Sequence, residues 1–153
     1  MTTRMPVLFL SHGGGPWPWV DGMREAFAVS EREFARLPAL LPDKPRAILV
    51  ISGHWEESEF TLATASHPPT IYDYSGFPPH TYQLKYSAPG APELATLVLH
   101  LLRAAGITVH EDPSRGFDHG VFVPLYLMYP QAEVPVLMLS MKHHYDPAEH
   151  IRL

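Results

Sequence analysis

Three continuous apolar runs predict buried β-strands, at residues Pro6–Leu10, Ala47–Ile51 and Val134–Leu139. Runs this short, with Gly and Pro beside them, are typical of strands that are covered on both faces. Residues Glu59–Ala65 alternate only in part and predict a strand nearer an edge of the sheet. A further short strand is predicted at Ile107–His110.

Apolar residues at helical spacing predict helices between these strands. The clearest is Ala91–Gly106, which has a proline in its first turn and a glycine past its end. Gly22–Leu37 and Val121–Met128 are predicted helices as well, and Asp146–Leu153 carries the capping signals of a helix start. Strands that alternate with helices predict a single α/β domain, with a mainly parallel or mixed central sheet and helices on both faces. In such sheets ligands bind at the carboxyl ends of the strands.

Composition excludes several classes of function. The 153 residues are enough for one domain. A net charge of -5 without a basic patch argues against nucleic-acid and anionic-membrane partners. The apolar run near the N-terminus is too short for a signal peptide or a membrane span. The absence of cysteine excludes disulfides and thiolate metal sites, and it fits a cytoplasmic protein.

Three of the strands end alike, and this is the first chemical signal. They read VLFLSHG, ILVISGHW and VLMLSMKHH, so each passes a serine and then reaches His12, His54, or the pair His143 and His144. If the strands are parallel neighbours, these imidazoles lie along one edge of the sheet, where they suit Zn, Fe, Cu or Ni. The plainer interpretation is that a histidine after a strand is a solvated surface residue. Glycines 13–15 let the backbone approach a neighbour closely, but they lack the spacing of a phosphate loop or a dinucleotide fingerprint.

A further histidine, His119, stands in the stretch GFDHGVF just before a predicted helix. A helix N-terminus disfavours the imidazolium form, so His119 is a candidate base near neutral pH. The alternative is a structural helix start at which Asp118 is the cap.

The long loop 66–89 contains the segment PPTIYDYSGFPPHTY, which is aromatic, stiffened by proline and nearly without charge. Such a segment can wall a pocket for a flat apolar substrate. The alternative is that the loop packs its own aromatic side chains on the sheet. The candidate substrate-binding residues are Tyr72, Phe77 and His80, with Tyr74 and Tyr82 beside them.

Five motifs, in order along nearly the whole chain, resemble the class III extradiol ring-cleavage dioxygenases, in their DOPA-4,5-dioxygenase-like branch. They are HGGGP at His12, SGHWE at His54, PPTIYDYSGFP at Pro68–Pro78, YSAPGAPELA at Tyr86–Ala95, and GFDHGVFVPL at Gly116–Leu125. The resemblance implies a non-haem Fe(II) enzyme that opens catechol-type rings with O2 to a muconic semialdehyde, and zinc occupies the site of some members. It also implies that His12 and His54 are metal ligands and that His119 is an active-site residue.

The chain departs from the family at its end. Members are longer, and their later portion carries an SGNxVHN-type motif and a further histidine that complete the site. Residues 1–153 are therefore predicted to form an extradiol dioxygenase-like domain that is incomplete at its C-terminal end. The third metal ligand stays open, with His143, His144 or a carboxylate as candidates.

Two rival functions remain at this stage. One is a zinc-binding protein without redox chemistry on the same scaffold, either a hydrolase or a binding protein. The other is an inactive fragment whose exposed apolar sheet surface recruits another subunit, which allows a homo-oligomer. For the enzyme, the expected partners are a small aromatic catechol and O2.

Overall fold

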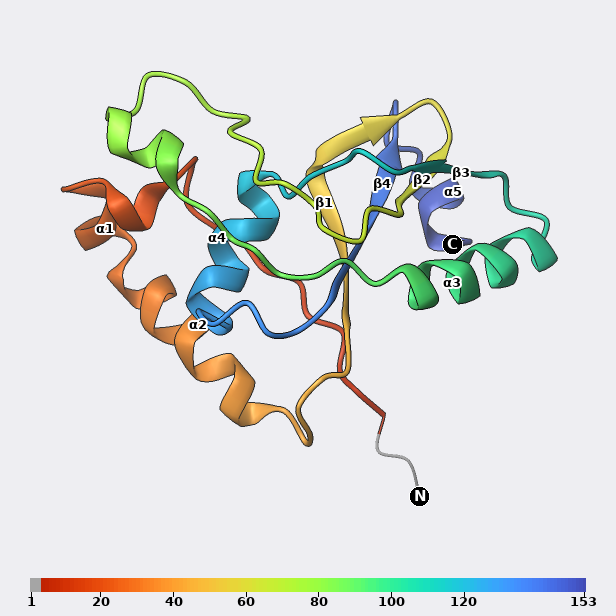
Figure 1. The fold of residues 1–153 in the computed structure, drawn as a ribbon, viewed down its shortest axis with the longest axis horizontal. Helices are drawn as coiled ribbons and strands as arrows, with labels where there is room; N and C mark the ends of the chain where they lie inside the picture. The colour runs from red at the N-terminus through yellow and green to blue at the C-terminus, as the bar shows by residue number, and fades with distance from the viewer. Residues whose placement is uncertain (1–3) are drawn as a thin grey trace.

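The computed structural model describes residues 4–153 and contains a four-stranded mixed sheet (Figure 1). The strands lie in the order β1-β4-β2-β3. β1 pairs with β4 and β2 with β3 in parallel, whereas β2 runs antiparallel to β4. The strand bounds are Ile48–Glu57 for β1, Phe60–Ala63 for β2, Val109–Asp112 for β3 and Val136–Lys142 for β4.

Helices cover both faces of this sheet, so the predicted α/β class is confirmed. α2 and α4 lie on one face and α3 lies on the other (Figure 1). The helix bounds are Met23–Ala26 for α1, Ala28–Leu40 for α2, Pro92–Ala104 for α3, His119–Met128 for α4 and Pro147–Ile151 for α5, with short 3-10 turns at Trp17–Trp19 and Pro79–Gln83. Between Phe60 and Lys142, the observed strands and helices lie within a few residues of their predicted positions.

The predicted strand at Pro6–Leu10 is wrong. These residues are extended coil with no ladder partner among the described residues, and the side chains of Val7 and Phe9 are 95% and 99% exposed. A run of apolar residues becomes a strand only where another strand offers backbone partners. The placement of Glu59–Ala65 near an edge is also wrong, because β2 lies inside the sheet between β4 and β3. All four residues of β2 are accordingly buried.

The predicted helix at Gly22–Leu37 differs in its details. It divides at Phe27 into α1 and α2, and α2 continues through Pro38 to Leu40. Asp146 caps α5 as predicted, since its carboxylate accepts a hydrogen bond from the backbone N–H of Ala148.

Part of the sheet face that α3 covers is exposed, at strand β1. In β4, Leu137 and Leu139 are buried in the apolar cluster that includes α3. Their register partners in β1, Leu49 and Ile51, share that face of the sheet and are 46% and 52% exposed. The cover that α3 provides does not extend to β1, so these two residues form an apolar strip, the β1 strip, of the kind that marks association sites.

Within residues 4–153, none of the helices combines the length and apolar character that a membrane crossing requires.

Candidate metal centre

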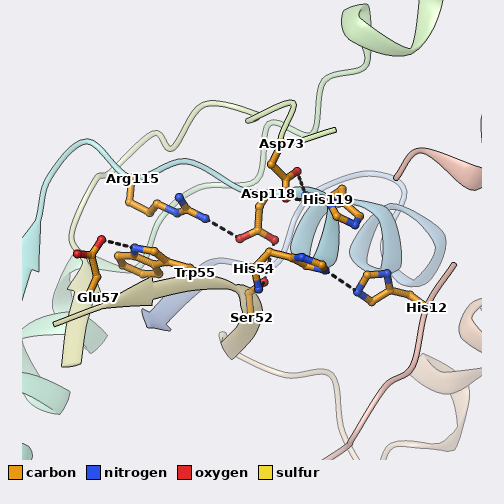
Figure 2. A network of polar contacts seen from close by, with 9 residues as sticks. All are labelled: His12, Ser52, His54, Trp55, Glu57, Asp73, Arg115, Asp118 and His119. Atoms are coloured by element: carbon orange, nitrogen blue, oxygen red, sulfur yellow. Dashed lines mark hydrogen bonds and ion pairs between the residues drawn. The ribbon is translucent and has the colours of Figure 1, made fainter. Parts of the chain in front are cut away.

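Three histidines from separate parts of the chain meet at one place, beside the sheet and the start of α4 (Figure 2). His12 comes from the N-terminal segment, His54 from β1 and His119 from the first turn of α4. Each offers a ring nitrogen, and the three nitrogens lie within 4.8 Å of one another. The expected convergence of His12 and His54 is therefore present, although His12 arrives on coil and not on a strand.

His12 and His54 face each other directly. Their Nε2 atoms are 3.4 Å apart. The Nδ1 of His12 donates to the carbonyl oxygen of Gly13 at 2.9 Å, because a carbonyl can only accept. The Nε2 of His12 is then free of hydrogen in the neutral ring, and its lone pair points toward His54.

His119 lies differently in the group. Its ring packs against His54 with centroids 4.1 Å apart and planes inclined by 39°, whereas the His12 centroid is 5.3 Å from each of the other two. His119 therefore packs on the ring of His54, and the His12 ring is equally far from both.

An irregularity in β1 carries His54 to this position. The register with β4 shifts between Ile51 and Glu56, and the four residues between them include His54. Such irregularities turn side chains in new directions and are frequent beside active sites. The predicted strand stopped at Ile51, but β1 continues through the shift to Glu57.

A buried carboxylate is linked to the backbone of His54 through one serine. Asp118 is fully buried, and its Oδ1 accepts a hydrogen bond from Ser52 Oγ at 2.8 Å. Ser52 Oγ in turn accepts from the backbone N–H of His54 at 3.2 Å. The other oxygen of Asp118 accepts from Arg115 at 2.8 Å, and the Arg115 guanidinium lies 4.9 Å from the centre of the Trp55 ring.

The predicted capping role of the Asp118 side chain is not what the structure shows. Asp118 occupies the N-cap position of α4, but its side chain makes no capping bond. Asp73 instead accepts from the backbone N–H of His119, the first residue of α4, at 2.9 Å, and from the ring Nδ1 of His119 at 2.8 Å (Figure 2). Burial tends to raise the pKa of Asp73, but the hydrogen bonds from His119 outweigh it and the pKa is lowered. Sequence reasoning missed Asp73, whose one signal is that it is the single acidic residue in loop 66–89.

The surroundings of His54 favour its neutral ring. Loss of hydration, followed by the nearby ring of His119, lowers the pKa of His54. A neutral imidazole is the form that binds a metal, so His54 keeps its lone pair available at a lower pH than an ordinary histidine does.

The structure does not bring His143 or His144 into the group. The Nδ1 of His143 lies 3.5 Å from a carboxylate oxygen of Glu56, and its side chain is 52% exposed. His144 follows in a turn with a positive φ of 73°. Within the described residues, His119 is the side chain that joins His12 and His54.

The aromatic loop packs partly on itself and partly on the group of three histidines. Tyr72 donates to the carbonyl of Leu84 at 2.7 Å, and His80 Nε2 donates to that of Trp19 at 2.9 Å. Phe77 lies over Gly15, whose φ of 55° and absent Cβ make room for that ring. The centroid of Tyr74 is 6.1 Å from that of His119. Burial raises the pKa of Tyr74 to about 12, so its hydroxyl stays protonated and donates to the carbonyl of Thr81.

Gly120 gives a first prediction, because it lets the ring of His54 lie close to α4. A Cβ at position 120 would come within 2.5 Å of Cδ2 of His54 and 3.1 Å of Oγ of Ser52. We expect Gly120→Ala to displace the His54 ring and to weaken Zn(II) binding by about 10- to 100-fold, the range seen when the support of a metal ligand is changed. Calorimetric titration with Zn(II) measures this change. Gly53→Ala is the matched control, since its Cβ meets no atom within 4 Å; equal affinities in the two variants would contradict the prediction.

Comparison with known proteins agrees with the geometry. The sequence profile of the family described as the catalytic LigB subunit of aromatic ring-opening dioxygenase matches residues 6–153. A 4,5-DOPA dioxygenase extradiol from Beta vulgaris is 45% identical over 96% of this chain and 54% of its own length. Dioxygenase tasH from Hapsidospora irregularis is 43% identical over 99% of this chain and 49% of its own.

A bacterial relative and a solved structure extend the match. A 4,5-DOPA dioxygenase extradiol from Escherichia coli K12 is 36% identical over 99% of this chain and 53% of its own. The crystal structure of an uncharacterized protein from Escherichia coli K12 superposes with a TM-score of 0.61 at 35% identity, over 78% of this chain and 43% of that one. The chain spans about half the length of the curated relatives it matches. It belongs to the LigB family of aromatic ring-opening dioxygenases, in the branch that resembles the DOPA dioxygenases.

Proposed function

We propose that this chain carries the metal-binding part of an extradiol dioxygenase, which opens catechol-type rings with O2 to a muconic semialdehyde. The observation that supports this most directly is the pair of Nε2 atoms of His12 and His54, 3.4 Å apart, in a chain that matches the LigB family over residues 6–153. The relatives named as 4,5-DOPA dioxygenases point to DOPA-like or related catechols as the substrate.

The residues present fit a divalent metal ion. The donors are imidazole nitrogens, and the 3.4 Å between the two Nε2 atoms suits either a ring N–H or a cation between them. The Nδ1 atoms of His12 and His119 are engaged by hydrogen bonds, so both rings present Nε2. Iron in the ferrous state suits this donor set and the reaction, and zinc suits the donors as well.

In the proposed mechanism, His12 and His54 would hold the iron. When bound, the ion would lower the pKa of a catechol hydroxyl and mediate electron transfer from the ring to O2. His119 accepts the proton of one catechol hydroxyl on Nε2, which Asp73 leaves free. Tyr74 and Phe77, whose rings are 5.4 Å apart, form a wall that excludes water from the His119 side of the site. Tyr72 and His80 hold the loop that carries this wall by their bonds to backbone carbonyls.

A second candidate function follows from the β1 strip. Leu49 and Ile51 are exposed beside a covered part of the same sheet face, and the relatives are about twice as long as the matched region. In this alternative the chain is inactive alone, and the β1 strip packs against a second copy or another subunit. The non-redox zinc protein remains the third candidate. For each of them we infer a cytoplasmic protein from the cysteine-free composition.

One experiment separates these candidates. The protein is loaded with Fe(II) without oxygen, mixed with a panel of catechols that includes DOPA, and then exposed to air. We expect a yellow semialdehyde to form while oxygen is consumed. His119→Phe should keep its iron and lose about 100-fold or more of the turnover, because a positioned proton acceptor contributes on this scale.

Three results would contradict the proposal in different ways. Bound iron without product or oxygen uptake would favour the inactive fragment, and a dimer in sedimentation would support that interpretation. Zinc retained in preference to iron, again without oxygen uptake, would favour the non-redox protein. Equal loss of iron and turnover in His119→Phe would make His119 a metal ligand.

A further inference from the structure

Asp73 holds His119 at two points, and we propose that it is a positioning residue that fixes the tautomer of the His119 ring. Its Oδ2 accepts from the ring Nδ1 at 2.8 Å and its Oδ1 accepts from the backbone N–H of His119 at 2.9 Å. The side chain of His119 is 9% exposed and that of Asp73 is 23% exposed, so water competes little for these bonds. Asp73 lies in the loop between β2 and α3, and His119 begins α4.

The chemistry of the pair leaves one arrangement for the neutral ring. A carboxylate has no hydrogen to donate, so the hydrogen between Asp73 and His119 belongs to Nδ1 of the ring. The Nε2 of His119 then carries a lone pair. Because the same carboxylate binds the backbone N–H, it cannot follow the ring away from this position, and the ring stays against His54 and near His12.

The consequence for catalysis rests on the proposed function. A catechol hydroxyl at the centre loses its proton to Nε2 of His119; the O–H bond breaks, an N–H bond forms, and the electron pair stays on the oxygen. The ring gains a positive charge, which lies beside the Asp73 carboxylate and is stabilised by it. With the opposite tautomer, Nε2 would already carry a hydrogen and could not accept this proton.

The variant Asp73→Asn tests the tautomer sharply. The backbone N–H of His119 can only donate, so the amide oxygen of the asparagine must face it. The amide NH2 group then faces Nδ1 and donates to it, which moves the ring hydrogen to Nε2. The reverse placement of the amide would set its NH2 group against the backbone N–H of His119, so that two donors face each other there. Asparagine has nearly the same shape as aspartate, but the group that faces Nδ1 of His119 is now a donor where the carboxylate was an acceptor.

The measurement is the pair of ring ¹⁵N shifts of His119 in the metal-free protein at pH 8, assigned by their absence in His119→Phe. We expect hydrogen on Nδ1 in the unaltered protein and on Nε2 in Asp73→Asn. Turnover of the Fe(II)-loaded variant should fall about 10²- to 10⁴-fold, as expected for loss of a base through a wrong tautomer. Binding of Zn(II) alone should change much less than turnover, since His12 and His54 are untouched. Asp43→Asn, an exposed change, should alter none of these quantities.

Two results would overturn the inference: hydrogen on Nε2 in the unaltered protein, or the same tautomer in Asp73→Asn. A switched tautomer with unchanged turnover would overturn the role of Asp73 in catalysis. Failure of the proposed function looks different, because no catechol is then opened by the unaltered protein while the ¹⁵N shifts still show the switch.

Discussion

Replacing either His12 or His54 with alanine is expected to abolish stoichiometric metal binding. Each variant removes one of the two facing Nε2 atoms and leaves only two ring nitrogens in the group, one on the remaining histidine and one on His119. The affinity should fall by well over 100-fold, beyond the range seen when only the support of a ligand is altered. Both variants should fold, because His12 is on coil and the His54 ring is at the surface. Metal content after dialysis, together with titration by Fe(II) and Zn(II), gives the result.

The control is His100→Ala, which changes an exposed histidine on α3 and should bind metal as the unaltered protein does. This control shows whether the loss of metal binding is specific to the histidine group or follows from removing any exposed histidine. Undiminished iron content in His12→Ala and His54→Ala would end the interpretation of this group as a metal centre. A loss in one variant alone would assign the metal to the histidine replaced in that variant and to His119.

The convergence of His12 and His54 was predictable because it follows from a simple rule. Each histidine comes shortly after an apolar run, and runs in α/β domains carry functional side chains at their carboxyl ends. The rule gave the right neighbours even though Pro6–Leu10 is coil. The rule does not hold for His143, which also comes shortly after an apolar run but turns toward Glu56. A pattern along one strand does not specify how far the chain continues in register before it turns.

Asp73 and the order of the strands could not be predicted for a related reason. Both depend on contacts between residues far apart in the chain. Loop 66–89 has no periodicity, so nothing local indicates that its one acidic side chain meets the start of α4. β2 partly alternates like an edge strand, yet it is buried because β4 and β3 pair on its two sides. The hydrophobic pattern of a segment indicates whether that segment is buried. The order of the strands and the partners of each side chain depend instead on contacts between segments far apart in the chain.

The second large effect is expected from Arg115→Met, which should lower the free energy of unfolding by about 3–5 kcal/mol. Asp118 is fully buried, and Arg115 is the cation that pairs with it, at 2.8 Å. Methionine keeps an apolar stem that can lie on Trp55 but leaves the buried carboxylate without its opposite charge. Urea unfolding of the metal-free protein measures the loss.

Arg103→Met provides the matched control. It removes the same charge from a pair with Glu111 whose side chains are 57% and 46% exposed, and such pairs contribute about 0–1 kcal/mol. The two variants therefore lose the same group from a buried and an exposed setting. Equal stability of Arg115→Met and Arg103→Met would show that Asp118 does not depend on Arg115. A large loss in Arg115→Met should also weaken metal binding, because Asp118 holds Ser52, and Ser52 accepts from the backbone of His54.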